Sequence, residues 1–173
     1  MIAPVHAPEG SPADELASIR DRLHSLYGDL ERDLARYGPL CRLSGRCCRF
    51  REYGHTLFIS DPEARVLIAD APRPARPLDD GQSCPWQDAR DRCTAREARP
   101  LGCRIFFCDP AFAEVSPQLS ETYLGKLKQL ANQHGWLWNY APLHRHLHEA
   151  RAEGRLQIAI TGPPGDWHDN PSP

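Results

Sequence analysis

The chain has 173 residues, which is enough for one domain with a sizeable core but short for two. Its formal net charge of −2 argues against a nucleic-acid or membrane-surface partner recognised by bulk positive charge. No apolar run approaches the roughly 18 residues that a membrane span needs, and residues 1–10 lack the basic and apolar regions of a secretory signal. We therefore expect a cytoplasmic protein that acts without nucleic acid or membrane.

Residues 1–10 are predicted to be a disordered N-terminus, and a long helix follows them. Ser11 is a good N-cap and Pro12 suits the first helical position. Apolar residues then recur at three- and four-residue steps over residues 12–37, after which Gly38 ends the pattern. The stripe favours a helix that packs on its own domain, and a homodimer through residues 12–37 is the alternative.

The rest of the chain contains shorter elements separated by turn-forming residues. The patterns predict, in chain order, a short extended segment over residues 56–59, a helix capped by Ser60 or Asp61, a proline-rich linker over 71–80, a helix from Ser116 to Gly135, an extended aromatic segment over 136–140, a helix from Pro142 to about Glu153, and a strand over 156–160. Residues 161–173 are predicted to be a disordered tail. We therefore expect a mainly α fold: a small single domain over residues 11–160, with irregular cysteine-rich loops around a metal site and at most a short β element.

Seven cysteines form two groups in the sequence. The first group is Cys41, Cys47 and Cys48, and the second is Cys84, Cys93, Cys103 and Cys108. A cytoplasmic protein keeps its thiols reduced, and an odd number cannot all pair, so a disulfide framework is not expected. Thiolate sulfur is a soft, negatively charged ligand that suits zinc or iron–sulfur clusters. We predict that the proline-rich linker returns the chain so that both groups meet around one metal centre.

Arginines surround both cysteine groups. The arginines that we expect to act on the thiols are Arg46, Arg49, Arg96, Arg99 and Arg104. Guanidinium groups lower the pKa of nearby thiols and offset the charge of a site with several thiolates. The alternative is that they are solvated partners of Asp88, Asp91 and Glu97.

Three segments resemble a known family: CRLSGRCC (residues 41–48), GQSCPW (residues 81–86) and CTAREARPLGCR (residues 93–104). Together they look like the CxxCxxCC cysteine-cluster family, the YkgJ-type zinc- or iron-chelating domain, over roughly residues 40–110. The resemblance implies a metal site in which iron and zinc both stay open, and it implies no common reaction. A related domain occurs in flagellin lysine methylases.

One position departs from the family pattern. Ser44 stands where the family has its second cysteine, and a serine hydroxyl is a poor ligand for soft metals. Either that cysteine is dispensable or this site uses fewer thiolates. The seven thiols still exceed what one four-coordinate metal needs, which favours an iron–sulfur cluster with spare cysteines over a single structural zinc. We rank the candidate ligands with Cys47, Cys48, Cys84, Cys93 and Cys103 ahead of Cys41 and Cys108.

Two functions are carried forward. The first is a metal-binding protein that holds an iron–sulfur cluster or iron centre for electron transfer, or in support of a modifying enzyme, with an unknown protein partner. The second is a zinc-stabilised structural or interaction module without catalysis. No catalytic residue is assigned, because the sequence contains no phosphate-binding loop and no dinucleotide fingerprint. A methyl-transfer enzyme ranks last, since no donor pocket is recognisable.

Three histidines and one tryptophan could also contribute to a metal site, but each could equally have a purely structural role. His144 and His148 would share one face of a helix, an arrangement that can chelate a metal, but the run HRHLH favours a solvated helix end. Replacement of His146 is then expected to leave metal content and solubility unchanged. His55 is a weaker candidate for a mixed site, and Trp86 either shields the site from water or belongs to the core.

Overall fold

The computed structural model describes residues 11–160, so the predicted disordered ends at 1–10 and 161–173 lie outside the described residues. The elements within this range are α1 (Pro12–Ala35), β1 (Phe58–Ser60), α2 (Asp61–Asp70), α3 (Leu101–Ile105), α4 (Ser116–His134), β2 (Tyr140–Pro142) and α5 (Leu143–Ala152), with short 3-10 turns at η1 (Arg46–Cys48) and η2 (Pro110–Phe112). The prediction of a mainly α single domain with a short β element is confirmed.

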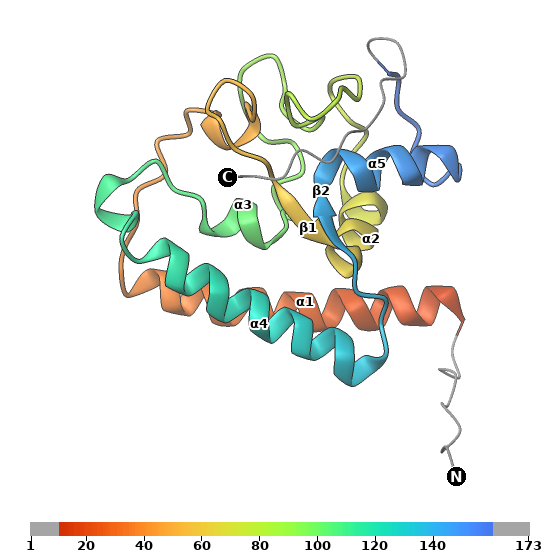
Figure 1. Ribbon diagram of the computed structural model, residues 1–173, viewed down its shortest axis with the longest axis horizontal. Coiled ribbons are helices and arrows are strands. Elements are labelled where there is room, and N and C mark those ends of the chain that lie inside the picture. Colours follow the sequence, from red (N-terminus) through yellow and green to blue (C-terminus); the bar gives the residue numbers. More distant parts are fainter. Residues whose placement is uncertain (1–10, 161–173) are drawn as a thin grey trace.

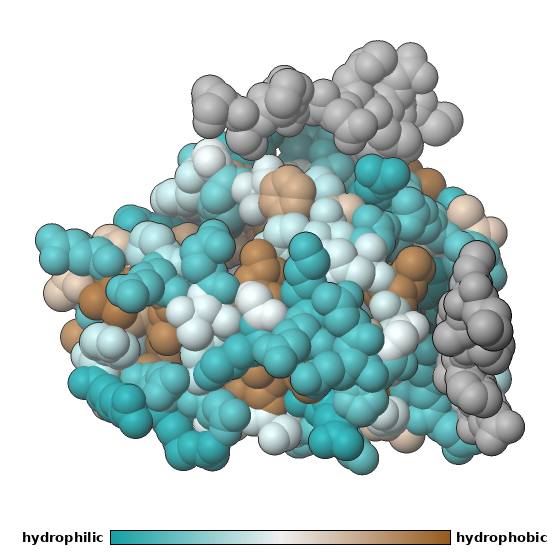
Figure 2. Space-filling model, turned by 60° about the horizontal axis from the view of Figure 1, so that its bottom comes forward, coloured by the Kyte–Doolittle hydropathy of each residue, from teal (hydrophilic) through white to brown (hydrophobic). Residues whose placement is uncertain are grey.

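The two long helices, α1 and α4, lie side by side and run in opposite directions (Figure 1). Helix α1 begins where the sequence predicts, since the Ser11 side chain and Asp14 form a reciprocal capping box. Its apolar stripe is buried against α4, α2 and α3: Ile19, Leu23, Leu26, Tyr27, Leu30 and Leu34. The helix therefore packs within its own domain, and a homodimer would have to use its exposed side. On the face in Figure 2, hydrophobic residues lie in separate groups between hydrophilic ones.

A second layer contains α2, α5 and the two-stranded sheet (Figure 1). Strands β1 and β2 are antiparallel, with Ile59 opposite Ala141. Helix α2 starts directly at the end of β1, where Ser60 and Glu63 form a second capping box. A second apolar cluster lies here, and it includes the buried Cys48, Cys84 and Trp86. The cysteine-bearing loops are thus part of this layer's core.

Two features differ from the sequence predictions. Residues 156–160 do not form a strand: the amide of Leu156 still bonds to the Ala150 carbonyl at the end of α5, and Ile160 makes a single bridge with Leu78 in the irregular linker. The short helix α3 was not predicted, because five residues are too few to show an apolar period. Within residues 11–160, no helix combines the length and apolarity needed to cross a membrane.

Candidate metal centre

The proline-rich linker brings the two cysteine groups together. It has no regular structure, and it turns where the amides of Ala75 and Arg76 both donate to the Pro85 carbonyl, at 2.9 and 3.0 Å. The amide of Cys84 then donates to the carbonyl of Cys48 at 2.8 Å. The first residue of the second group is therefore hydrogen-bonded to the last residue of the first.

All seven cysteines line one cavity of about 70 Å³. Apolar side chains complete its wall, among them Leu57, Leu67 and Leu143. Trp86 also lines it and is 1% exposed, while its indole N–H donates to the Pro72 carbonyl at 2.8 Å. Trp86 thus belongs to the core and borders the cavity as well.

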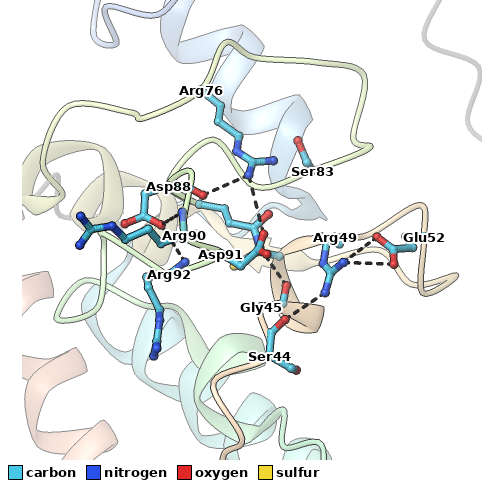
Figure 3. Close-up of polar contacts among 12 residues, drawn as sticks. Ser44, Gly45, Arg49, Glu52, Arg76, Ser83, Asp88, Arg90, Asp91 and Arg92 are labelled. Atoms are coloured by element: carbon cyan, nitrogen blue, oxygen red, sulfur yellow. Dashed lines mark hydrogen bonds and ion pairs between the residues drawn. The ribbon is translucent and has the colours of Figure 1, made fainter.

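Gly45 allows the two cysteine loops to approach closely. Its φ of +69° lies in the left-handed region, and a Cβ at this position would come within 2.6 Å of Gln87 Nε2 and 2.7 Å of the Asp91 carbonyl. Gln87 Nε2 instead donates to the Gly45 carbonyl at 3.1 Å, and Figure 3 shows Gly45 facing the turn that contains Asp91. No sequence pattern indicates this role for Gln87. The residue is fully buried, and its Oε1 has no hydrogen-bond partner in the described part of the chain.

Five thiols form the inner part of the centre. Cys48 is 4% exposed, its Sγ lies 3.9 Å from that of Cys47, and Cys84 and Cys93 both act on its pKa. Cys103 interacts electrostatically with Cys47, Cys84 and Cys93. The structure thus brings together the five cysteines that the sequence ranked first.

The other two cysteines also line the cavity. Cys41 is exposed, and the Sγ of Cys108 lies 3.3 Å from the Oγ of Ser44. The amide of Leu40 donates to Asp109 Oδ2 at 3.2 Å, which ties the segment before Cys41 to the segment after Cys108. Ser44, which replaces a cysteine of the resembling family, therefore lines the cavity and contacts a thiol there.

The thiols differ in acidity because they share hydrogen bonds. Hydrogen bonding with Cys48 lowers the pKa of Cys93 to about 6 and that of Cys47 to about 7. The pKa of Cys48 is raised, first by its hydrogen bonds to neighbouring thiols and then by burial. Burial, followed by repulsion from neighbouring thiolates, raises the pKa of Cys103 well above its ordinary value. The proton is thus held most strongly at the innermost thiols.

Two of the expected arginines act on the thiols. Arg99 lowers the pKa of both Cys47 and Cys93, and Arg96 contributes at Cys93. Both arginines line the cavity, so their positive charge faces the thiols.

The other three arginines hold the surrounding framework. Arg49 donates to both carboxylate oxygens of Glu52 at 3.1 Å and to the Ser44 carbonyl at 3.0 Å (Figure 3). Arg46 lies over the ring of Tyr53, and Arg104 lies over that of Tyr27. The expectation that all five arginines serve the thiols is therefore too broad.

The histidines of α5 are held by neighbouring segments. His146 is 4% exposed, and its Nε2 lies 3.1 Å from the Ile59 carbonyl, so the expectation of a solvated helix end is wrong for it. His148 Nε2 lies 3.4 Å from the Asp79 carbonyl. Because His146 ties α5 to β1, its replacement should reduce stability, which makes it a poor control for metal binding.

His55 lies beside the centre without lining the cavity. Its Nε2 is 3.4 Å from the Cys47 carbonyl, and its ring stacks on Phe106 with centroids 5.3 Å apart. His55 therefore positions the first cysteine loop through the backbone of Cys47.

The arrangement of the side chains is not a ready-made coordination shell. Among residues 11–160, no group of three or more His, Cys, Asp or Glu side chains is placed so that it could hold a metal ion as it stands. The donors themselves suit a soft metal, because all seven are reduced thiols around one cavity. Metal binding would therefore require the thiol side chains to turn toward a common centre.

Comparisons with protein-family models, curated proteins and solved structures find no match for this chain. The resemblance to the CxxCxxCC family rests on the segments quoted above and stays a prediction.

Proposed function

We propose that this protein binds iron through its cysteine thiolates, as an iron–sulfur cluster or an iron centre, for electron transfer or in support of a modifying enzyme. The observation that carries the proposal is that seven cysteines from separate loops line one cavity. Thiolates are the usual protein ligands of iron–sulfur clusters, and Arg96 and Arg99 supply charge that offsets them. The resemblance of residues 40–110 to the CxxCxxCC family supports a metal site built from cysteine thiolates, with iron or zinc as the metal.

The inner five thiols are the proposed ligands: Cys47, Cys48, Cys84, Cys93 and Cys103. An iron–sulfur cluster supplies one-electron chemistry when bound. Cys41 and Cys108 are then spare thiols in the wall of the cavity. The proposed compartment is the cytoplasm, where the seven thiols stay reduced, and electron transfer would require a protein partner.

A single zinc ion is the second candidate, in an interaction module without catalysis. The observation that favours it is that three other thiols, Cys47, Cys84 and Cys93, all act on the pKa of Cys48, since four thiolates are the usual shell of a structural zinc. The cavity of about 70 Å³ also suits one ion better than a multinuclear cluster.

Anaerobic purification of the full chain distinguishes the two candidates. An iron protein should be brown, absorb at about 400 nm through sulfur-to-iron charge transfer, and contain iron, with acid-labile sulfide if a cluster is present. A colourless protein with one zinc per chain would overturn the iron proposal in favour of the zinc module. A protein with neither metal, even after anaerobic reconstitution with iron and sulfide, would overturn both.

Cysteine variants test the proposed ligands. Cys84→Ser and Cys103→Ser should lose metal and solubility together, because metal binding is coupled to folding in small metal domains. Cys41→Ser is the matched control, since Cys41 is exposed and this variant should retain the metal. Full metal content in both inner variants would mean that other residues bind it.

A further inference from the structure

A second cavity, of about 310 Å³, lies between α1, α2 and the segment that leads into α3. No cysteine lines it, and it is separated from the thiols by the chain around Pro100, which borders both cavities. Its volume is at the lower end of the range for small-molecule sites. The cavity is therefore large enough for a small organic molecule.

One wall of this cavity is apolar. Leu23 projects from α1, Val66 from α2, and Ala98 and Pro100 from the intervening segment. Leu23 and Val66 belong to the buried core around α1. A ligand would thus meet hydrocarbon side chains along this side, where an apolar body is favoured over water.

Two of the carboxylates that line the cavity are already satisfied. Glu63 is 3% exposed and accepts four hydrogen bonds: from the Tyr27 hydroxyl at 2.8 Å, the Leu101 amide at 2.7 Å, and the amide and hydroxyl of Ser60 at 2.9 and 2.7 Å. Asp70 accepts two from Arg20, at 2.6 and 2.5 Å. The third, Glu97, is exposed to water. Glu63 and Asp70 are therefore satisfied by hydrogen bonds, and water solvates Glu97, so none of the three carboxylates needs a donor from a ligand in the cavity.

Arg104 borders the cavity and has hydrogen-bonding capacity to spare. Its side chain is 10% exposed, and it donates to the carbonyls of Arg99 and Glu97, both at 2.7 Å, and to Glu31 at 3.2 Å. Glu31 is 66% exposed, so water screens this ion pair. A guanidinium has five N–H donors. Within the described residues, Nε, Nη1 and Nη2 of Arg104 each donate one hydrogen bond, so two N–H groups are left for an anion.

We propose that this second cavity binds a small organic monocarboxylate, with its carboxylate at Arg104 and its apolar body against Leu23, Val66 and Ala98. A buried guanidinium forms strong hydrogen bonds with a carboxylate, and the hydrocarbon wall selects an organic acid over a bare inorganic anion. Exposed His24 lines the same cavity, at the side of α1 that faces water. The site involves no thiol, so it stands whether or not the protein binds metal.

Titration of the isotope-labelled full chain by NMR tests the site, with benzoate and hexanoate as probes. Both should produce saturable shifts of the amides of Leu23, Val66 and Ala98. Benzyl alcohol, which lacks the charge, should bind about tenfold or more weakly, because a hydrogen bond to a charged group contributes on the order of 1.5–3 kcal/mol. Inorganic phosphate, which lacks the apolar body, should also bind more weakly than benzoate.

Two variants and a control test whether benzoate binds in this cavity and at Arg104. Arg104→Met keeps the apolar stem but removes the donors, and it should abolish the preference for benzoate over benzyl alcohol. Because Arg104→Met also removes framework contacts, Ala98→Leu provides a second variant that fills the cavity and should eliminate binding. Arg22→Ala, on α1 next to Leu23 but outside the cavity, should bind benzoate like the original protein.

Any of four results would overturn the proposal. The first three are the absence of saturable shifts with both acids, equal affinity for benzoate and benzyl alcohol, and unchanged benzoate binding in Ala98→Leu. Tighter binding of phosphate than of benzoate would overturn it in favour of an inorganic-anion site. The titration is repeated on metal-free and metal-loaded protein. Benzoate binding in both would show that the second cavity functions independently of the proposed metal site.

Discussion

Gly45 is the residue on which the contact between the two cysteine loops depends. Gly45→Ala should reduce the free energy of unfolding by more than about 2 kcal/mol, because a left-handed backbone costs on the order of 1 kcal/mol for a non-glycine residue and the added Cβ would overlap Gln87 and Asp91. Gly54→Ala is the control: its φ is +63°, but nothing lies within 4 Å of the added Cβ. Urea unfolding measures both, and equal losses would show that the approach of the loops is unimportant.

Cys48 sets the acidity of its neighbours, and this gives a pH prediction for the metal-free, reduced protein. Alkylation of Cys93 should reach half its maximum at pH about 6, far below the ordinary thiol value of 9.0. Cys48→Ala removes the largest cause of the lowered pKa, so alkylation of Cys93 should shift to higher pH. Mass spectrometry of the peptide follows the modification, and wild-type Cys93 that titrates near 9 would contradict the assignment.

The same shift predicts a direction for stability. The pKa of Cys93 is lower in the folded chain than in the unfolded one, so its ionised form stabilises the fold at high pH, and this contribution is lost as pH falls from about 9 to about 6. The raised pKa values of Cys48 and Cys103 act in the opposite sense, since their contribution is lost as pH rises above the ordinary thiol range. Unfolding of Cys93→Ser should therefore depend less on pH between about 6 and 9 than that of the wild type.

At the scale of elements, the start of α3 depends on Glu63, a residue of α2. Glu63 accepts hydrogen bonds from the Leu101 amide, the Tyr27 hydroxyl and two donors of Ser60, so it joins α1, β1, α2 and α3. Glu63→Gln should cost about 3 kcal/mol of unfolding free energy, because the amide group presents donors to donors in a buried position. Tyr27→Phe removes one donor and should cost about 1 kcal/mol. Urea unfolding distinguishes them, and similar small losses would contradict this role for Glu63.

Elements with local signals were predictable from the sequence, and those that depend on distant contacts were not. Helix α1 begins at the Ser11 cap and α4 ends at Gly135, which adopts the left-handed conformation that its position suggests. Helix α3 has no comparable local signal, since its first amide is bound by Glu63 from elsewhere in the chain. In the cysteine centre, residue types indicated the thiols, whereas the role of Gln87 depends on which segments fold against it.

For the whole molecule, the two apolar clusters divide the core into a part without cysteine and a part that contains Cys48 and Cys84. The first cluster joins α1 and α4 through residues such as Leu30 and Leu127. The second joins the cysteine loops to α2 and α5. The proposed metal binding should therefore order the part that contains Cys48 and Cys84 more than the part around α1 and α4.

Hydrogen exchange measured by mass spectrometry tests this implication. Loading the protein with metal should slow exchange in residues 75–95, because this segment carries cysteines and its hydrogen bonds, such as that from the Cys84 amide to Cys48, belong to turns and loops and not to a helix or sheet. Exchange in α1 and α4 should change little, because their helical hydrogen bonds and buried apolar contacts involve no thiol. The Cys103→Ser variant, given the same metal, is the control and should show no added protection. Equal protection of both parts would mean that the metal stabilises the fold globally, and protection confined to α1 and α4 would place the metal elsewhere.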